Sequence, residues 1–179
     1  MDGMKPDSSG FWGRVFSYIG DWAIALVLSA IVFWGLIQWQ QPNVPEQAPL
    51  WSLPSIEGNL VSLEEFKGKT VVLSFWATYC GVCRQEAPAM SAFSETNEDV
   101  VVLGMVADGD PRSLPVVAKK WGMTYPIIMT SREVLEEYNV KAFPTTVVVG
   151  PDGKTINSHT GKLSLAEIEA LTQGRGGCN

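Results

Sequence analysis

Two cysteines three positions apart are the residues of this chain whose types and spacing are best suited to chemistry. Cys80 and Cys83 form a C-x-x-C pair, and the third cysteine, Cys178, lies in a Gly-rich tail. Such a pair is typical of a redox dithiol, of half a metal site or of a structural disulfide. As a redox dithiol it would take up or give two electrons by thiol–disulfide exchange.

The metal and structural alternatives fit the sequence less well. A zinc site takes about four ligands, and only Cys178 and His159, the single histidine, remain to complete one. A disulfide that closes so short a loop removes little chain entropy from the unfolded state and therefore stabilises little. We expect a redox-active disulfide with no metal and no further cofactor.

The predicted elements place the dithiol at the start of a helix. Residues 70–76 (TVVLSFW) are a continuous apolar run typical of a strand buried on both faces, and residues 81–96 are compatible with a helix. Cys80 then lies in the N-cap region, where free N–H groups and the helix dipole favour a thiolate. We predict Cys80 as the nucleophile and Cys83, one turn later, as the resolving thiol that attacks the mixed disulfide.

The rest of this region alternates strands with helices. We predict a hairpin around residues 51–63, strands at 100–106, 125–129, 145–149 and 154–159, and helices at 112–122, 132–138 and from Ser164 onwards. Ser164 and Glu167 form a capping-box pattern at the start of the last helix. This order predicts an α/β sandwich with a mixed central sheet.

An apolar segment precedes this region. Residues 22–39 (WAIALVLSAIVFWGLIQW) carry no charge, and as a helix they would span roughly 27 Å, close to the hydrocarbon thickness of a bilayer. Lys5 and Arg14 precede the segment and no cation follows until Lys67, which puts the N-terminus in the cytoplasm. We predict one transmembrane helix; a buried core helix and a cleaved signal peptide are the alternatives.

The apolar segment divides the chain into five predicted parts. They are a cytoplasmic segment at residues 1–21, the anchor at 22–39, a Pro-rich linker at 40–50, one folded domain at 51–172 and a flexible tail at 173–179. The length of 179 residues leaves little room for a further domain. The net charge of −6 argues against a nucleic-acid partner, because phosphate binding needs a basic face.

The residues around the dithiol resemble the active-site segment of thioredoxins. The segment at residues 75–83 (FWATYCGVC) matches it. Glu86 and Pro88, three and five residues after the second cysteine, match the membrane-anchored thioredoxin-like group that includes TlpA, ResA and CcmG; the oxidoreductases of copper-sensitivity operons (ScsD) are close to it. The resemblance covers residues 50–172. It implies a thioredoxin fold with an N-terminal hairpin extension and a protein thiol–disulfide oxidoreductase.

The same resemblance implies a location and partners. The protein would be a single-pass protein of the bacterial inner membrane, held in the lipid bilayer by residues 22–39, with its catalytic domain in the periplasm. Its partners would be exported proteins with thiols or disulfides, in cytochrome c maturation or in a periplasmic thiol or copper-stress relay, and a membrane electron-transfer protein that recharges the dithiol. Gly81 and Val82 provide no histidine between the cysteines, which favours a reductant over an oxidant.

A second segment, residues 142–146 (AFPTT), resembles the cis-proline loop of thioredoxins, which lies opposite the dithiol. The resemblance implies a cis peptide bond before Pro144, whose bend leaves the Phe143 backbone free to pair with an extended substrate chain. A proline at the start of a strand is the alternative, as core packing is for the aromatic residues. The predicted substrate-binding residues are Trp76, Tyr79, Phe143, Pro144 and Thr145.

Two carboxylates are candidates for proton transfer at the buried cysteine. Thioredoxins have an Asp in the strand before the dithiol, where this chain has Ser74. In the ResA-like group a carboxylate after the next strand takes this role, which implies Asp108; a solvated turn at residues 108–111 is the alternative. Glu86 is the second candidate, and its alternative is a first-turn acid that interacts favourably with the helix dipole.

Two other functions would use the same thiols or fold. A Cu(I)-binding chaperone is the main alternative, because thiolates select Cu(I); the related Sco proteins, however, have a longer cysteine spacing and a partnering histidine. A peroxidase of the peroxiredoxin type would need a P-x-x-x-T-x-x-C signature, and Leu73 and Ala77 occupy its Pro and Thr positions. We therefore expect a protein thiol–disulfide oxidoreductase.

Overall fold

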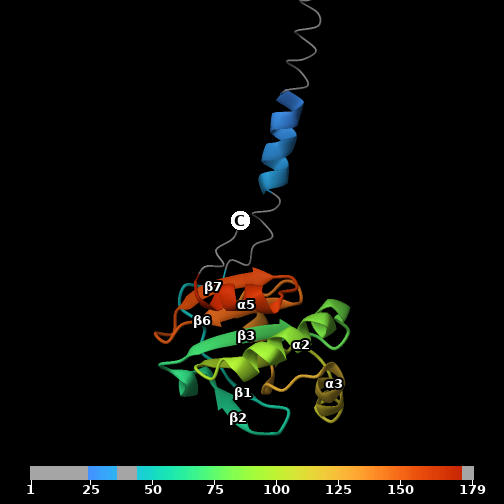
Figure 1. Cartoon of the computed structure of the whole chain (residues 1–179), viewed down its shortest axis with the longest axis vertical. Helices are drawn as coiled ribbons and strands as arrows, with labels where there is room; N and C mark the ends of the chain where they lie inside the picture. Colours follow the sequence, from blue (N-terminus) through green and yellow to red (C-terminus); the bar gives the residue numbers. More distant parts are fainter. Residues whose placement is uncertain (1–23, 36–43, 175–179) are drawn as a thin grey trace, which may run out of the picture. The chain divides into compact units, whose positions relative to one another are not determined.

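The computed structural model describes residues 24–35 and 44–174 (Figure 1). The chain divides into two units, Met1–Gln41 and Pro42–Asn179. In the first unit, residues 24–35 form a helix. Among the helices that the structure describes, none combines the length and the apolar character needed to cross a membrane.

Several sequence predictions fall outside the described residues. The predicted anchor at 22–39 extends beyond the described helix at both ends, and the predicted segment at 1–21 lies wholly outside it. The first residues of the predicted linker at 40–50 and the end of the tail at 173–179, including Cys178, also lie outside. The anchor, the linker and the tail remain predictions from the sequence.

A five-stranded mixed sheet is the centre of the second unit (Figure 1). The strand order is β5-β4-β3-β6-β7, in which β3, β4 and β5 run parallel while β6 is antiparallel to both β3 and β7. The strands are β3 (Thr70–Trp76), β4 (Val100–Val106), β5 (Ile127–Met129), β6 (Thr145–Val149) and β7 (Thr155–Thr160). A separate antiparallel hairpin, β1 (Ser52–Pro54) and β2 (Leu60–Ser62), precedes the sheet. The predicted mixed sheet and N-terminal hairpin are confirmed.

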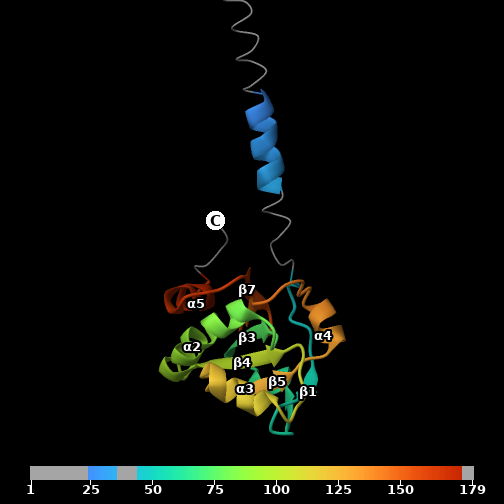
Figure 2. The same cartoon turned by 90° about the vertical axis from the view of Figure 1, so that its right-hand side faces the viewer.

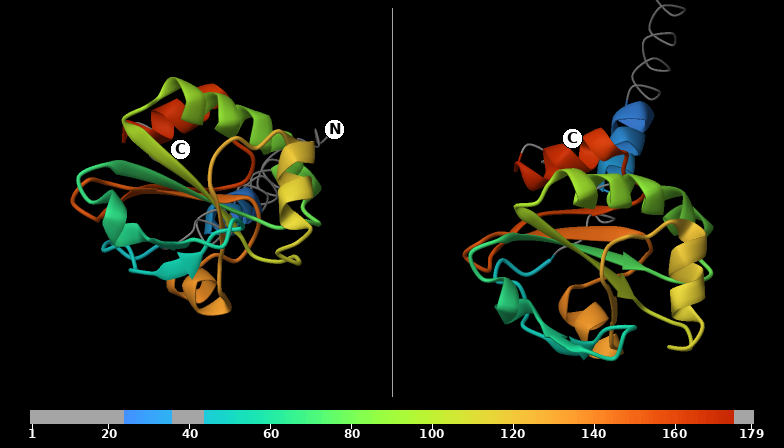
Figure 3. Two further views of the ribbon diagram at one scale, coloured as in Figure 1. Left: turned by 90° about the horizontal axis from the view of Figure 1, so that it is seen from below. Right: turned by 60° about the horizontal axis from the view of Figure 1, so that its bottom comes forward.

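Helices cover both faces of this sheet (Figures 2 and 3). They are α2 (Gly81–Thr96), α3 (Leu114–Trp121), α4 (Arg132–Glu137) and α5 (Leu165–Thr172), with a 3₁₀ turn η1 (Leu63–Phe66) after the hairpin. Helices α2 and α5 lie on one face, whereas α4 and the hairpin lie on the other. The dithiol therefore follows a central strand and opens a helix that is packed along its length.

The alternation of side chains along β3 explains the two-sided core. Val72 packs with Met90 and Phe93 of α2 on one face. Leu73, on the opposite face, belongs to a cluster that includes Tyr138 at the end of α4. Because successive residues of a strand point to opposite faces, a continuous apolar run is needed to bury both. This is the pattern that predicted the strand.

The element ends differ from the prediction by one or two residues. The predicted strand at 125–129 begins at Ile127, because Pro126, which has no N–H to donate, precedes it. The predicted helix at 112–122 starts at Leu114 and ends before Gly122, whose φ of +69° favours glycine. The capping box at Ser164 is present as predicted.

Gly104 in β4 leaves room for two buried aromatic side chains, Tyr125 and Trp76. A Cβ at this position would lie 2.8 Å from Tyr125 Cε2 and 3.1 Å from Trp76 Nε1. We expect Gly104→Ala to lower the free energy of unfolding by about 1–3 kcal/mol in urea denaturation, because the buried rings must shift. Gly81→Ala is the matched control, since its Cβ would meet nothing within 4 Å. An equal loss in both variants would contradict the clash.

Candidate active site

The end of β3 and the start of α2 position the dithiol. Cys80 is the N-cap residue of α2, and its Sγ accepts a hydrogen bond from the backbone N–H of Cys83 at 3.1 Å. The two cysteines form a disulfide, with their Cα atoms 5.3 Å apart. The Cys83 N–H and the dipole at the start of the helix would stabilise a thiolate on Cys80 after reduction.

The two sulfurs differ in their access to solvent. Cys83 is 3% exposed and packs in a cluster with Trp76 and Ala87. Cys80 is half-buried, and its neighbours Tyr79 and Val82 are exposed. An external thiol or disulfide can therefore approach Cys80. Cys83 is shielded from such a partner and can react only with the sulfur of Cys80.

The loop before β6 lies beside the dithiol loop. Thr145 pairs with Phe75 in the register of β3 and β6, which places Pro144 next to the end of β3. The Phe143–Pro144 peptide bond is cis. Phe143 is half-buried and packs against the cluster that contains Cys83. Two segments separated by some sixty residues of sequence thus meet at one edge of the sheet.

A buried carboxylate lies one helical turn after Cys83. Glu86 is 2% exposed, and its Oε1 accepts a hydrogen bond from the backbone N–H of Leu163 at 2.8 Å. Burial raises the pKa of Glu86 to about 7, although the Leu163 N–H and the charge of Lys162 act to lower it. Cys83 and Glu86 are separated by three residues, so they share a face of α2. The alternative of a first-turn acid is wrong, because α2 begins at Gly81 and its first turn holds no acidic residue.

The comparisons with known proteins agree with this site. The model of the AhpC/TSA family matches residues 44–157. Thioredoxin-like protein YneN of Bacillus subtilis is 34% identical over 128 residues, which cover 69% of this chain and 75% of that protein. Thiol-disulfide oxidoreductase ResA of Bacillus subtilis is 32% identical over 124 residues, 68% of this chain and 69% of that protein. The chain belongs to the AhpC/TSA family.

A solved structure agrees with the fold and with the chemistry. The structure of a putative thiol:disulfide interchange protein DsbE from Chlorobium tepidum superposes with a TM-score of 0.65 at 27% identity, covering 74% of this chain and 94% of that one. The chain is thus a thioredoxin-like thiol–disulfide oxidoreductase of the ResA/DsbE group, with the thioredoxin fold. The predicted resemblance, enzyme class and C-x-x-C redox disulfide are confirmed.

In this ResA-like oxidoreductase, Asp108 holds the loop that leads to the dithiol. Its Oδ1 accepts a hydrogen bond from the Thr78 N–H and its Oδ2 accepts one from the Thr78 hydroxyl, both at 2.6 Å. The carboxylate is half-buried, so the alternative of a solvated turn does not describe it. Both oxygens serve a residue two positions before Cys80, and this geometry supports a positioning role for Asp108.

Removing the Asp108 carboxylate is expected to loosen this loop. We expect Asp108→Ala to lower the free energy of unfolding by about 1–3 kcal/mol, because the Thr78 N–H and hydroxyl lose their acceptor. Thr78→Val is the matched control, since it deletes only the hydroxyl bond and should cost less. Urea denaturation measures both losses, and an Asp108→Ala variant as stable as the wild type would contradict the bonding.

Three of the five predicted substrate-binding residues, Trp76, Pro144 and Thr145, are buried. Trp76 is 1% exposed and packs on Trp121 with the ring centroids 5.1 Å apart. Thr145 is fully buried, and its hydroxyl donates to the Ala142 carbonyl at 2.8 Å. Burial gives the Trp76 and Thr145 side chains core and loop-holding contacts, and the substrate-binding role of the five residues remains a prediction. Tyr79, at 76% exposure, remains available.

The described residues contain no cluster of metal-ligating side chains, and the single histidine, His159, lies in an edge strand. Within residues 24–35 and 44–174, no group of three or more His, Cys, Asp or Glu side chains is arranged to hold a metal ion. His159 lies in β7, where it pairs with Thr146 in the antiparallel register.

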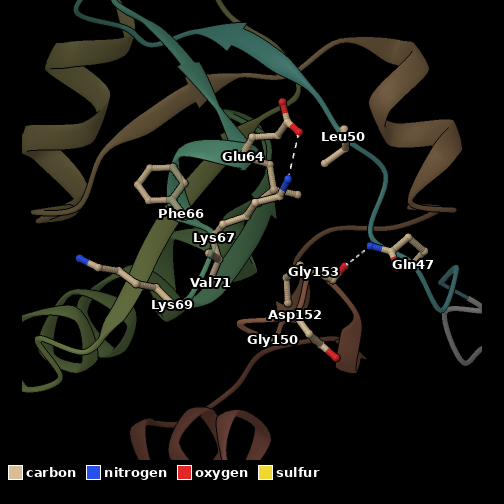
Figure 4. Close-up of a pocket in the computed structure, with 12 residues that line it drawn as sticks. Gln47, Leu50, Glu64, Phe66, Lys67, Lys69, Val71, Gly150, Asp152 and Gly153 are labelled. Carbon is tan, nitrogen blue, oxygen red and sulfur yellow. Dashed lines mark hydrogen bonds and ion pairs between the residues drawn. The ribbon is translucent and has the colours of Figure 1, made fainter.

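A small cavity lies at the start of β3, at the opposite end of that strand from the dithiol (Figure 4). Its volume is about 130 Å³, and Val71 forms part of its apolar wall. Several of its polar groups already have partners: Gln47 Nε2 donates to the Gly153 carbonyl at 2.9 Å, and Lys67 forms an ion pair with Glu64 at 3.3 Å. The cavity lacks a cysteine, and we assign it no part in thiol exchange.

Sequence reasoning missed a groove beside the dithiol. It has a volume of about 320 Å³, and its lining includes Cys80, Arg84 of α2, and Lys120 and Trp121 of α3. Arg84 is four residues after Cys80, a spacing that places both on one face of a helix. The spacing of Cys80 and Arg84 was therefore the only part of the groove that the sequence could indicate. The approach of α3 is a tertiary contact, which no local pattern reveals.

Proposed function

We propose that this ResA-like oxidoreductase is a membrane-anchored reductant of exported proteins. The observation that carries the proposal is the dithiol geometry: an accessible Cys80 sulfur at the N-cap of α2, above a Cys83 sulfur that is buried. This arrangement suits a nucleophile that meets a partner and a second thiol that resolves the product.

The proposed reaction moves two electrons from the dithiol to a substrate disulfide. The Cys80 thiolate attacks one substrate sulfur, which forms a mixed disulfide and releases the other substrate sulfur as a thiolate. Cys83 then loses its proton and attacks Cys80 Sγ, which releases the second substrate thiol and leaves the Cys80–Cys83 disulfide. We propose Glu86 as the group that accepts the proton of Cys83, because it is buried on the same helix face. Asp108, the other candidate from the sequence, acts by holding Thr78.

The proposed location and partners rest on the sequence pattern. Residues 22–39 are apolar and uncharged, with cations only on the N-terminal side until Lys67, which supports an anchor with the domain outside the cytoplasm. A reductant in that compartment needs a membrane electron-transfer protein to restore its dithiol. Its substrates would be exported thiol proteins, in cytochrome c maturation or in a periplasmic thiol or copper-stress relay.

The redox state of the dithiol in growing cells tests the reductant role. Cells would carry the Cys178→Ser chain, so that only Cys80 and Cys83 report, and free thiols would be tagged with an alkylating reagent that adds mass. We expect a mainly reduced dithiol that becomes oxidised when the membrane electron donor is lost. A dithiol that is mainly oxidised, and unaffected by that loss, would overturn the reductant role.

A further inference from the structure

The groove beside the dithiol carries positive charge on a chain that is acidic overall. The formal net charge of the chain is −6, yet Arg84 and Lys120 both line the groove next to Cys80. Both are exposed. Within the described part of the chain, neither side chain forms an ion pair or a hydrogen bond. Two cations without partners therefore lie beside the sulfur that meets the substrate.

Packing holds the two helices that present these cations. Arg84 lies on α2, one turn after Cys80, and Lys120 lies near the end of α3. Trp121, the next residue of α3, packs against Trp76 at the end of β3 with the ring centroids 5.1 Å apart. Trp76 and Trp121 share a buried cluster with Ala87 of α2, so core packing holds the two helices beside each other.

No acidic residue lines the groove, and the carboxylate bonded to one of its lining residues, Asp108, is already engaged. Asp108 is linked to the groove through Thr78, and both of its carboxylate oxygens accept hydrogen bonds from that residue. Tyr79, which also lines the groove, is 76% exposed and offers an aromatic surface. The groove therefore combines a ring, two cations and the reacting sulfur.

We propose that this groove binds an acidic segment of the substrate protein, close in sequence to the substrate's reacting cysteine. The proposal rests on the proposed function and names the class of polypeptide that this same site prefers. Carboxylates of the segment would pair with the Arg84 guanidinium and the Lys120 ammonium. Because the groove is open to solvent, the pairing acts mainly on the rate of productive encounter and weakens as salt is added.

Three matched peptides test the proposal on the full-length chain. Each carries one cysteine as a mixed disulfide with glutathione, flanked by Asp and Glu, by Asn and Gln, or by Lys. We expect the reduced wild-type protein to attack the acidic peptide about tenfold faster than the neutral one at low salt, and the Lys peptide slowest. The acidic preference should shrink in about 0.5 M NaCl, where screening is short-ranged.

Reversing the charge of the two cations tests whether they cause the preference. The double variant Arg84→Glu, Lys120→Glu should prefer the Lys peptide, whereas the matched control Lys119→Glu, on α3 but outside the groove lining, should keep the wild-type order. Positive charges beside Cys80 would also stabilise its thiolate. The acidic-to-neutral rate ratio within each variant removes that effect, and reaction with the neutral peptide shows that the variant is folded.

The outcomes separate this proposal from the function on which it rests. Equal rates for the three peptides with the wild type, or an acidic preference that survives charge reversal, would overturn the groove proposal while leaving the exchange activity intact. Absence of reaction with every peptide would overturn the proposed function itself.

Discussion

A Cys83→Ala variant is expected to accumulate in cells as a mixed disulfide with its substrate on Cys80. Cys83 is 3% exposed and lies one turn after Cys80, so in the wild type it resolves the intermediate before a solvent thiol can. Without it, release depends on slow attack from outside. Non-reducing electrophoresis would show the adduct, and mass spectrometry would identify the attached protein and the bonded cysteine.

The matched variant Cys80→Ser defines the nucleophile. It retains the buried thiol but loses the accessible one, so we expect no adduct and a loss of exchange by about a thousandfold or more. Both variants should carry Cys178→Ser, so that each retains a single cysteine of the C-x-x-C pair. An adduct on Cys83 in the Cys80→Ser variant would show that the roles of the two cysteines are reversed.

Replacement of Glu86 by Gln is expected to stabilise the fold above neutral pH while slowing the reaction. The pKa of Glu86 is raised from 4.5 to about 7 in the folded state, chiefly by burial. The folded protein therefore binds this proton more tightly than the unfolded chain, and the free energy of unfolding falls as pH rises from about 4.5 to about 7. Above pH 7 the buried charge costs about 3 kcal/mol.

The Glu86→Gln variant should recover that free energy, because its amide oxygen can still accept the Leu163 N–H. Urea denaturation of the oxidised proteins would show the variant more stable than wild type at pH 8 and equally stable at pH 4. Glu95→Gln, an exposed position on the same helix, should change little at either pH. A Glu86→Gln variant no more stable than wild type at pH 8 would contradict the buried charge.

The catalytic part of this prediction separates a proton-transfer role from a packing role. If Glu86 accepts the proton of Cys83, the Gln variant should resolve the mixed disulfide about a hundredfold more slowly at pH 7, although it is more stable. Resolution is followed as the release of the second substrate thiol in a single turnover. An unchanged rate would leave Glu86 as a structural residue.

Sequence patterns were sufficient for the order of the elements and for the position of the dithiol. The apolar run at residues 70–76, the C-x-x-C spacing and the Ser164 capping box are all local, and each depends on residues within a turn or a strand of one another. The element ends were one or two residues off, because local patterns locate the ends of helices and strands only to within one or two residues.

The tertiary structure alone decided the chemistry around the dithiol. Glu86 is bonded to Leu163, 77 residues away, and Asp108 to Thr78, 30 residues away. Pairing of β3 with β6 places Pro144 beside the dithiol loop, and the approach of α3 brings Lys120 to the groove.

The difference between what the sequence determined and what the tertiary structure decided has a physical cause. Helix and strand formation depends on neighbours in sequence, so residue types and spacing determined that this protein has an N-cap cysteine with a second cysteine one turn later. A carboxyl pKa, the access to a sulfur and the charge of a groove depend on desolvation and on partners that only the folded chain brings together. The sequence therefore determined which atoms react, and the tertiary structure decided their protonation and their surroundings.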